Sequence, residues 1–291
     1  MTTSTPAQHT IATADGRRIA VQVTGPDDGL PVMFGHVAPG SRRFDPDPAA
    51  TAEAGIRLIT LDRPGYGGSD RLPEEVAPTI PVFADDCATV LDHLGVQAAA
   101  TAGWSAGGRI VLALAARRPD LVRSVAVIGT PAPDDEVAWI GAEEKGMISA
   151  LSADPDSALA TLEQMLAPIT ADPAAGLGMI GGGPADEAAL ADGDLRADLE
   201  TMLSEAFAQG SAGLAADLMS YTLTAWGFDP RAVGAPVRCW YGDADPGVGP
   251  AHGKWWAEQV PDGRLTVVPD AGHLLVRPVW AEVLRWCQTT P

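Results

Sequence analysis

The pentapeptide Gly103-Trp104-Ser105-Ala106-Gly107 constrains this chain most, because it lies between an apolar segment at 98–104 and a helix-like segment at 106–117. A sharp turn from a buried strand into a helix brings two backbones close together, which requires small residues on both sides of the turn. Such a turn exposes the serine hydroxyl and points the first N–H groups of the helix toward the same space. The pattern predicts a nucleophilic serine. The alternative is a glycine-rich turn whose serine only caps the helix.

Strand-like and helix-like segments alternate on both sides of this turn. Residues 10–14 and 18–24 flank Asp15-Gly16 and predict a hairpin. The other strand-like segments are 32–34, 56–61, 98–104, 122–128, 236–241 and 265–268. Helical spacing of apolar residues marks 83–94, 106–117, 252–259 and 274–288. Alternation of this kind predicts an α/β fold, with a mostly parallel sheet covered by helices on both faces.

The segment 134–225 differs from the rest, because it is rich in Ala, Asp and Glu and shows no strand pattern. Helical stretches are expected near 136–151, 156–167, 194–208 and 212–224. We predict a helical cap at 134–225, inserted into a core formed by 1–133 and 226–291. The cap holds 17 acidic and 2 basic residues. The favoured interpretation is solvated helix faces that promote solubility. The alternative is a lid that attracts a cationic group, such as a substrate amine.

Composition excludes several classes of function. The net charge of −19 and the pI near 4.4 argue against nucleic-acid binding, which needs clustered Lys and Arg. Cys87, Cys239 and Cys287 are far apart, so we expect neither a disulfide framework nor a zinc site. No signal sequence and no apolar run of about 20 residues is visible, which predicts a soluble cytoplasmic protein without a membrane partner. No sequence feature specifies an oligomeric state.

Two later loops carry groups that could assist a serine nucleophile. Asp243-Ala244-Asp245 follows the strand-like segment at 236–241, and Asp270-Ala271-Gly272-His273 follows the next one. Both loops are expected at the carboxyl ends of strands, where the sites of α/β sheets lie. A serine hydroxyl needs a base, and the base needs a carboxylate to orient it.

Five segments together resemble the α/β-hydrolase-fold proteins of the cap-bearing esterase, lipase and C–C hydrolase type. They are GHVAPGSR (35–42), LDRPGYGGSD (61–70), GWSAGG (103–108), YGDADP (241–246) and AGH (271–273). The resemblance covers roughly residues 10–133 and 226–291. It implies a mostly parallel sheet of about eight strands with an inserted helical cap. It also implies no metal and no organic cofactor.

The resemblance also assigns roles to individual residues. Ser105 is the expected nucleophile and His273 the expected general base. The family's G-x-x-D spacing selects Asp245 as the acid, with Asp243 as the main competitor and Asp134 as a distant third.

The oxyanion hole is expected to combine the N–H groups of Ala38 and Ala106. Similar proteins have His-Gly-x-Pro-Gly in the first of these loops, but this chain has Val37 in the place of the glycine. Glycine tolerates backbone angles that a β-branched residue does not. The departure predicts either a differently shaped loop or a narrower site.

The favoured function is hydrolysis of a small or medium hydrophobic ester or lactone through an acyl-enzyme. Residues expected to line the substrate pocket are Val37, Trp104, Trp139, Met147, Met179 and Tyr221. Three alternatives use the same fold. They are C–C bond hydrolysis, aminopeptidase action suggested by the acidic cap, and a non-hydrolytic cyclase or binding protein suggested by Val37 and the cap methionines.

Overall fold

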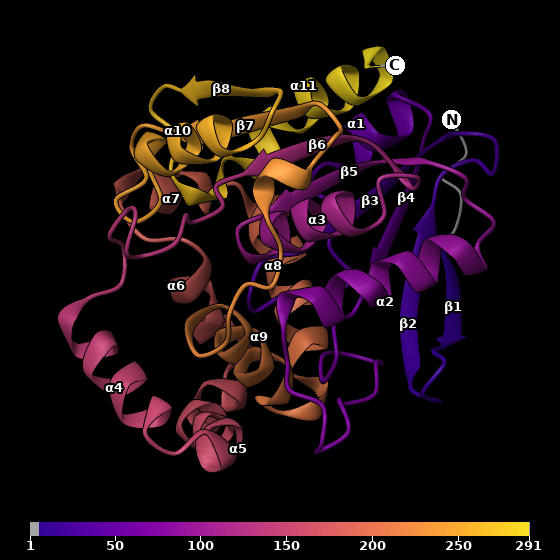
Figure 1. Cartoon of the computed structure of the whole chain (residues 1–291). Helices are drawn as coiled ribbons and strands as arrows, with labels where there is room; N and C mark the ends of the chain where they lie inside the picture. The colour runs from indigo at the N-terminus through magenta and orange to yellow at the C-terminus, as the bar shows by residue number, and fades with distance from the viewer. Residues whose placement is uncertain (1–5, 291) are drawn as a thin grey trace.

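Eight strands form one central sheet in the computed structural model (Figure 1). The strands are β1 (Ala7–Ala12), β2 (Arg18–Thr24), β3 (Leu30–Gly35), β4 (Ile56–Leu61), β5 (Ala99–Trp104), β6 (Val122–Ile128), β7 (Val237–Gly242) and β8 (Gly263–Val268). Their spatial order is β1-β2-β4-β3-β5-β6-β7-β8. The pairs β1–β2 and β2–β4 are antiparallel, and all later pairs are parallel. The predicted α/β fold with a mostly parallel sheet is confirmed.

The structure describes residues 6–290, apart from the side chain of Pro173. Residues 1–5 and residue 291 lie outside the described residues. The first five belong to the predicted core and to the N-terminal segment in which no signal sequence was expected. No helix within the described part of the chain is long and apolar enough to cross a membrane.

Helices flank the sheet and fill the segment between β6 and β7. The α-helices are α1 (Pro48–Glu53), α2 (Ile80–His93), α3 (Ala106–Arg117), α4 (Ala142–Ser152), α5 (Pro155–Leu166), α6 (Leu177–Ile180), α7 (Pro184–Ala189), α8 (Gly193–Ala206), α9 (Ala212–Thr222), α10 (Pro250–Gln259) and α11 (Val276–Thr289). Short 3₁₀ helices are η1 (Ala167–Ala171), η2 (Pro173–Gly176), η3 (Phe207–Gln209), η4 (Pro230–Ala232) and η5 (His273–Leu275).

An apolar core lies on each face of the sheet, because successive strand residues point to opposite faces. On β3, Met33 packs into the core that includes helices α2, α3 and α10, whereas Phe34 packs into the core that includes α11. Helix α8 of the segment between β6 and β7 belongs to this second core through Leu199 and Met202. Figure 1 shows α2 and α3 on one side of the sheet and α11 on the other. Burial on both faces explains the nearly continuous apolar runs of the central strands.

Every described element between β6 and β7 is helical, and the predicted stretches correspond to α4, α5, α8 and α9. Helices α6 and α7 are additional, and they flank Gly181-Gly182-Gly183. They have only four and six residues, too few for a helical pattern to stand out. The division into a core at 1–133 and 226–291 and a cap at 134–225 stays a prediction.

Candidate active site

Ser105 lies between β5 and α3 with φ 53° and ψ −120°, a left-handed conformation that is rare for a residue with a side chain. Such a conformation costs on the order of 1–3 kcal/mol and persists only where the surroundings enforce it. Here the Ser105 N–H donates to the Ile128 carbonyl at 2.8 Å. A Cβ on Gly107 would overlap the Gly35 carbonyl, and a Cβ on Gly103 would overlap the backbone of Gly107. The close approach predicted from the pentapeptide is therefore present.

His273 and Asp245 meet at the same edge of the sheet. His273 Nδ1 lies 2.7 Å from Asp245 Oδ2, and both side chains are largely buried. The other oxygen, Asp245 Oδ1, accepts from the N–H groups of Gly247 at 2.9 Å and Val248 at 2.8 Å. Burial alone would raise the pKa of Asp245, but hydrogen bonding and the proximity of His273 outweigh it and hold that pKa below 3.8. This carboxylate is therefore ionised at neutral pH and orients the imidazole.

The two competing carboxylates have different partners. Asp243 accepts from the N–H of Asp270 at 2.7 Å, which ties two loops together. Asp134 accepts from two backbone N–H groups and pairs with Lys145 at 2.7 Å. Among these three candidates the geometry favours Asp245 as the partner of His273.

A cavity of about 280 Å³ brings most of the expected site residues together. Its wall includes Ser105, His273, Asp245, Ala38 and Ala106, and also the expected pocket residues Trp139, Met179 and Tyr221.

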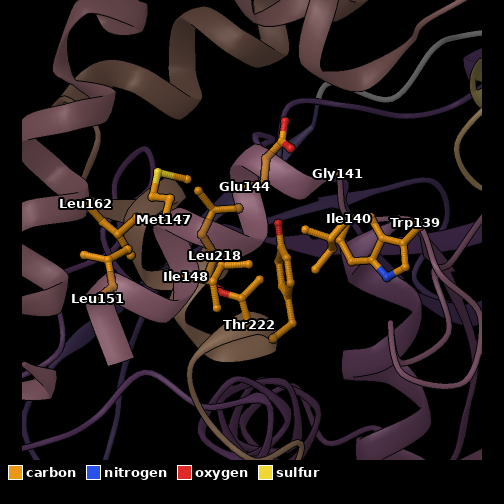
Figure 2. Close-up of a pocket in the computed structure, with 11 residues that line it drawn as sticks. Trp139, Ile140, Gly141, Glu144, Met147, Ile148, Leu151, Leu162, Leu218 and Thr222 are labelled. Atoms are coloured by element: carbon orange, nitrogen blue, oxygen red, sulfur yellow. The ribbon is translucent and has the colours of Figure 1, made fainter. Parts of the chain in front are cut away.

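Three of the expected pocket residues lie elsewhere. Val37 is 1% exposed and packs into the core that contains α11. Trp104 is fully buried in that core, and its indole Nε1 donates to the His273 carbonyl at 3.0 Å. Neither Val37 nor Trp104 lines the cavity, because both side chains are buried in the core behind it. Met147 lines a neighbouring cavity of about 230 Å³ between α4, α5 and α9, which shares Trp139 and Tyr221 with the first cavity (Figure 2). Helix α4, which carries Met147, stands away from the sheet (Figure 1).

Arg63 fixes the loop that follows β3. Its guanidinium donates to the carbonyls of His36 at 2.8 Å and Val37 at 2.9 Å, and it pairs with Asp217 of α9. Val37 does not adopt a positive φ, so a β-branched residue fits this loop without the strain that the sequence suggested. The loop differs in shape from one that would need glycine at this position.

The two expected oxyanion donors belong to residues that line the cavity, and no backbone acceptor competes for their N–H groups among the described residues. Ala106 is the first residue of α3, so its N–H has no acceptor within the helix. The Ala38 N–H has no hydrogen-bond acceptor among the described residues. Both residues border the cavity that Ser105 lines, so both N–H groups are available to a ligand there.

Two charged residues at or near this site were not among the predicted site residues. Arg109, in the first turn of α3, lines the cavity, and no sequence motif distinguishes it from other helix residues. Asp186 of α7 is buried and accepts from the N–H groups of Gly182 at 2.9 Å and Leu274 at 2.8 Å. Asp186 is one of 17 acids in its segment, and no local pattern distinguishes it. Across residues 6–290, no group of three His, Cys, Asp or Glu side chains is placed to hold a metal ion.

A family model and a curated relative match most of this chain. The family model of the alpha/beta hydrolase fold matches residues 32–276. A relative named pimeloyl-[acyl-carrier protein] methyl ester esterase, from Chromobacterium violaceum, is 31% identical over 220 residues, which cover 73% of this chain and 75% of that protein.

Solved structures share the fold along nearly the whole chain. An esterase from a Rhodococcus species has a TM-score of 0.71 at 22% identity, covering 98% of this chain and 99% of that one. A bromoperoxidase from Bacillus anthracis has a TM-score of 0.71 at 23% identity, with the same coverage. These likenesses concern the fold alone. With the family match over residues 32–276, they show that the chain belongs to the alpha/beta hydrolase fold family.

Proposed function

We propose that the protein is a serine hydrolase that cleaves carboxylic esters, including lactones, through an acyl-enzyme. The observation that carries this proposal is the 2.7 Å contact between His273 Nδ1 and Asp245 Oδ2 on the wall of a cavity that Ser105 also lines. The name of the Chromobacterium relative, a methyl ester esterase, supports ester hydrolysis. The apolar wall residues Trp139, Met179 and Tyr221 favour a substrate with a small or medium hydrophobic part.

The proposed reaction has two steps. Ser105 Oγ attacks the ester carbonyl while His273 Nε2 takes the hydroxyl proton, and Asp245 stabilises the imidazolium that forms. The N–H groups of Ala38 and Ala106 hold the negative charge that develops on the carbonyl oxygen. The imidazolium then protonates the leaving alcohol, and an acyl-enzyme remains on Ser105. Water attacks this acyl group with His273 again as base, which releases the acid and restores the serine.

Two structural observations weigh against alternatives raised by the sequence. Among the described residues of the cavity wall, Asp245 is the only carboxylate, and it pairs with His273, so the wall does not favour an amine. The non-hydrolytic alternative rested partly on Val37, whose backbone is unstrained here. The same three side chains could also serve C–C bond hydrolysis, but no observation favours that reaction over ester cleavage.

The test is Ser105→Ala assayed with p-nitrophenyl acetate and p-nitrophenyl butyrate. The wild-type protein should show a burst of p-nitrophenol and covalent labelling of Ser105 by a fluorophosphonate. Ser105→Ala should lose both, with kcat falling by about 10⁴-fold or more. The control is Ser152→Ala, an exposed serine on α4, which should keep wild-type turnover and labelling. Turnover that survives Ser105→Ala would refute the mechanism.

A further inference from the structure

We infer that Arg109 binds a carboxylate carried by the substrate, so that the preferred ester bears a second, negatively charged end. This inference rests on the proposed function, because it adds a substrate class to the same site. Arg109 is one of the residues that line the cavity that contains Ser105. It lies in the first turn of α3, which begins directly after Ser105.

Arg109 has two nitrogen atoms without a hydrogen-bond partner, although only 1% of its surface is exposed. Its Nε and Nη2 are buried and have no hydrogen-bond acceptor within residues 6–290. Burial lowers the pKa of Arg109 to about 10, so the side chain still carries its charge at neutral pH. A buried charge without a partner is costly, and such groups need an explanation.

Other arginines with little exposed side-chain surface have carboxylate partners. Arg63 pairs with Asp217, and the half-buried Arg17 donates to both oxygens of Asp86 at 2.9 and 2.8 Å. Arg42 Nη1 pairs with Asp62 Oδ2. Arg109 has no carboxylate within 4.0 Å in the part of the chain that the structure describes. Its position at the cavity distinguishes it from the paired residues and indicates that the missing anion is a ligand.

Three aromatic rings lie around the guanidinium of Arg109. The Arg109 Cζ lies 4.5 Å from the centroid of Tyr221, 4.9 Å from that of Trp226 and 5.6 Å from that of Trp139. Rings attract a cation through their faces. They supply no oxygen acceptor to Nε or Nη2 of Arg109. A planar carboxylate accepts two such N–H groups in parallel, which is the geometry that arginine provides and lysine does not.

If Arg109 has a purely structural role, its contacts with the aromatic rings are the only reason for a buried arginine at this position. That role predicts equal effects of a substitution on charged and uncharged substrates. Carboxylate binding predicts an effect confined to charged substrates, expressed mainly in KM. Because Ser105 and Arg109 line the same cavity of about 280 Å³, the carboxylate and the ester carbonyl should be separated by only a few carbon atoms.

The experiment compares matched ester pairs by acid release in a pH-stat. Monomethyl glutarate is compared with methyl valerate, and 4-acetoxybutyrate with butyl acetate, so that the carboxylate lies on the acyl side in one pair and on the alcohol side in the other. The wild-type protein should prefer the charged member of at least one pair by 10-fold or more in kcat/KM. Arg109→Met should abolish this preference through KM and leave the neutral esters within about 3-fold. The control Arg231→Met, an exposed arginine on η4, should retain the preference.

Two further variants keep the inference testable if Arg109→Met does not fold or no ester turns over. Arg109→Lys retains the charge but not the planar fork, so KM should rise about 10-fold for the charged ester alone. Glutarate binding to Ser105→Ala, measured by calorimetry, does not depend on hydrolysis and should weaken about 10-fold when Arg109→Lys is added. No charged preference in either pair together with no glutarate binding would overturn the inference. A parallel loss for charged and neutral esters would also overturn it. Failure of turnover alone would count only against ester hydrolysis.

Discussion

Asp45, in the loop before α1, is a buried carboxylate outside the candidate active site. Its Oδ1 accepts from the Thr51 hydroxyl at 2.8 Å and the Asp47 N–H at 3.1 Å, but its Oδ2 is buried with no partner among the described residues. Burial raises the pKa of Asp45 to about 6, despite these two hydrogen bonds. Between about pH 4 and pH 6 the folded protein therefore holds a proton that the unfolded chain has lost. Stability should fall as the pH rises through this window.

Asp45→Asn should remove this penalty, because the amide stays neutral. We expect the variant to exceed the wild-type free energy of unfolding by about 2–3 kcal/mol at pH 8 and to match it near pH 4. Urea unfolding at the two pH values measures the difference, with the exposed Asp27→Asn as a control that should show no such pH dependence. An equal effect of Asp45→Asn at both pH values would contradict this account.

At the level of single residues, the sequence could predict those that belong to local patterns. Ser105 was identified by the glycines around it, and His273 and Asp245 by loops that follow strands. Arg109 and Asp186 could not be identified in this way, because their meaning depends on what surrounds them in space. Arg109 is significant only because no carboxylate reaches it, and this requires the positions of α9 and the loop at Trp139.

Helix α7 supports the loop that carries His273. The Asp186 carboxylate of α7 accepts from the N–H of Leu274, the residue next to His273, and from the N–H of Gly182. Removing this buried carboxylate would leave both backbone N–H groups without a hydrogen-bond partner, which is costly. We interpret Asp186 as a positioning residue that holds the imidazole in place.

Asp186→Ala should lower kcat about 10-fold and leave KM nearly unchanged, because the substrate still binds while the base is misplaced. The rate of fluorophosphonate labelling of Ser105 should fall to the same extent. Asp186→Asn keeps one acceptor oxygen and should restore part of both rates. Asp192→Ala, which removes only an exposed cap of α8, serves as the matched control. A rise in KM without a change in kcat would show that α7 shapes the pocket instead.

At the level of elements, the strands and long helices followed from apolar patterns, but some elements did not. Strand β1 starts at Ala7, earlier than predicted, because its exposed residues pair through the backbone with β2 and carry little apolar signal. Helix α1 depends on its cap, where Asp47 accepts from the N–H groups of Ala49 and Ala50. Helices α6 and α7 are short and follow from local turns. Patterns of side-chain burial cannot reveal elements that bury few side chains.

The whole molecule carries a net charge of −19, and the segment 134–225 supplies most of it. The excess negative charges repel one another in the folded state. Salt screens this repulsion, because the Debye length falls to about 10 Å at an ionic strength of 0.1 M. We expect the Tm to rise by about 2 °C or more between 10 and 200 mM NaCl. The double variant Asp135→Asn/Glu136→Gln, which removes two exposed charges, should show a smaller rise. A Tm that falls with salt would show that ion pairs outweigh the repulsion.

The ion pair between Arg63 and Asp217 has a consequence for protein engineering. Replacing the helices between β6 and β7 by those of another protein would remove Asp217 and leave Arg63 buried without its counter-ion. The carbonyls of His36 and Val37 would then lose a rigid anchor, although no residue of their own loop had been altered. A successful chimera must therefore supply a new counter-ion within the replacement segment, or replace Arg63 at the same time.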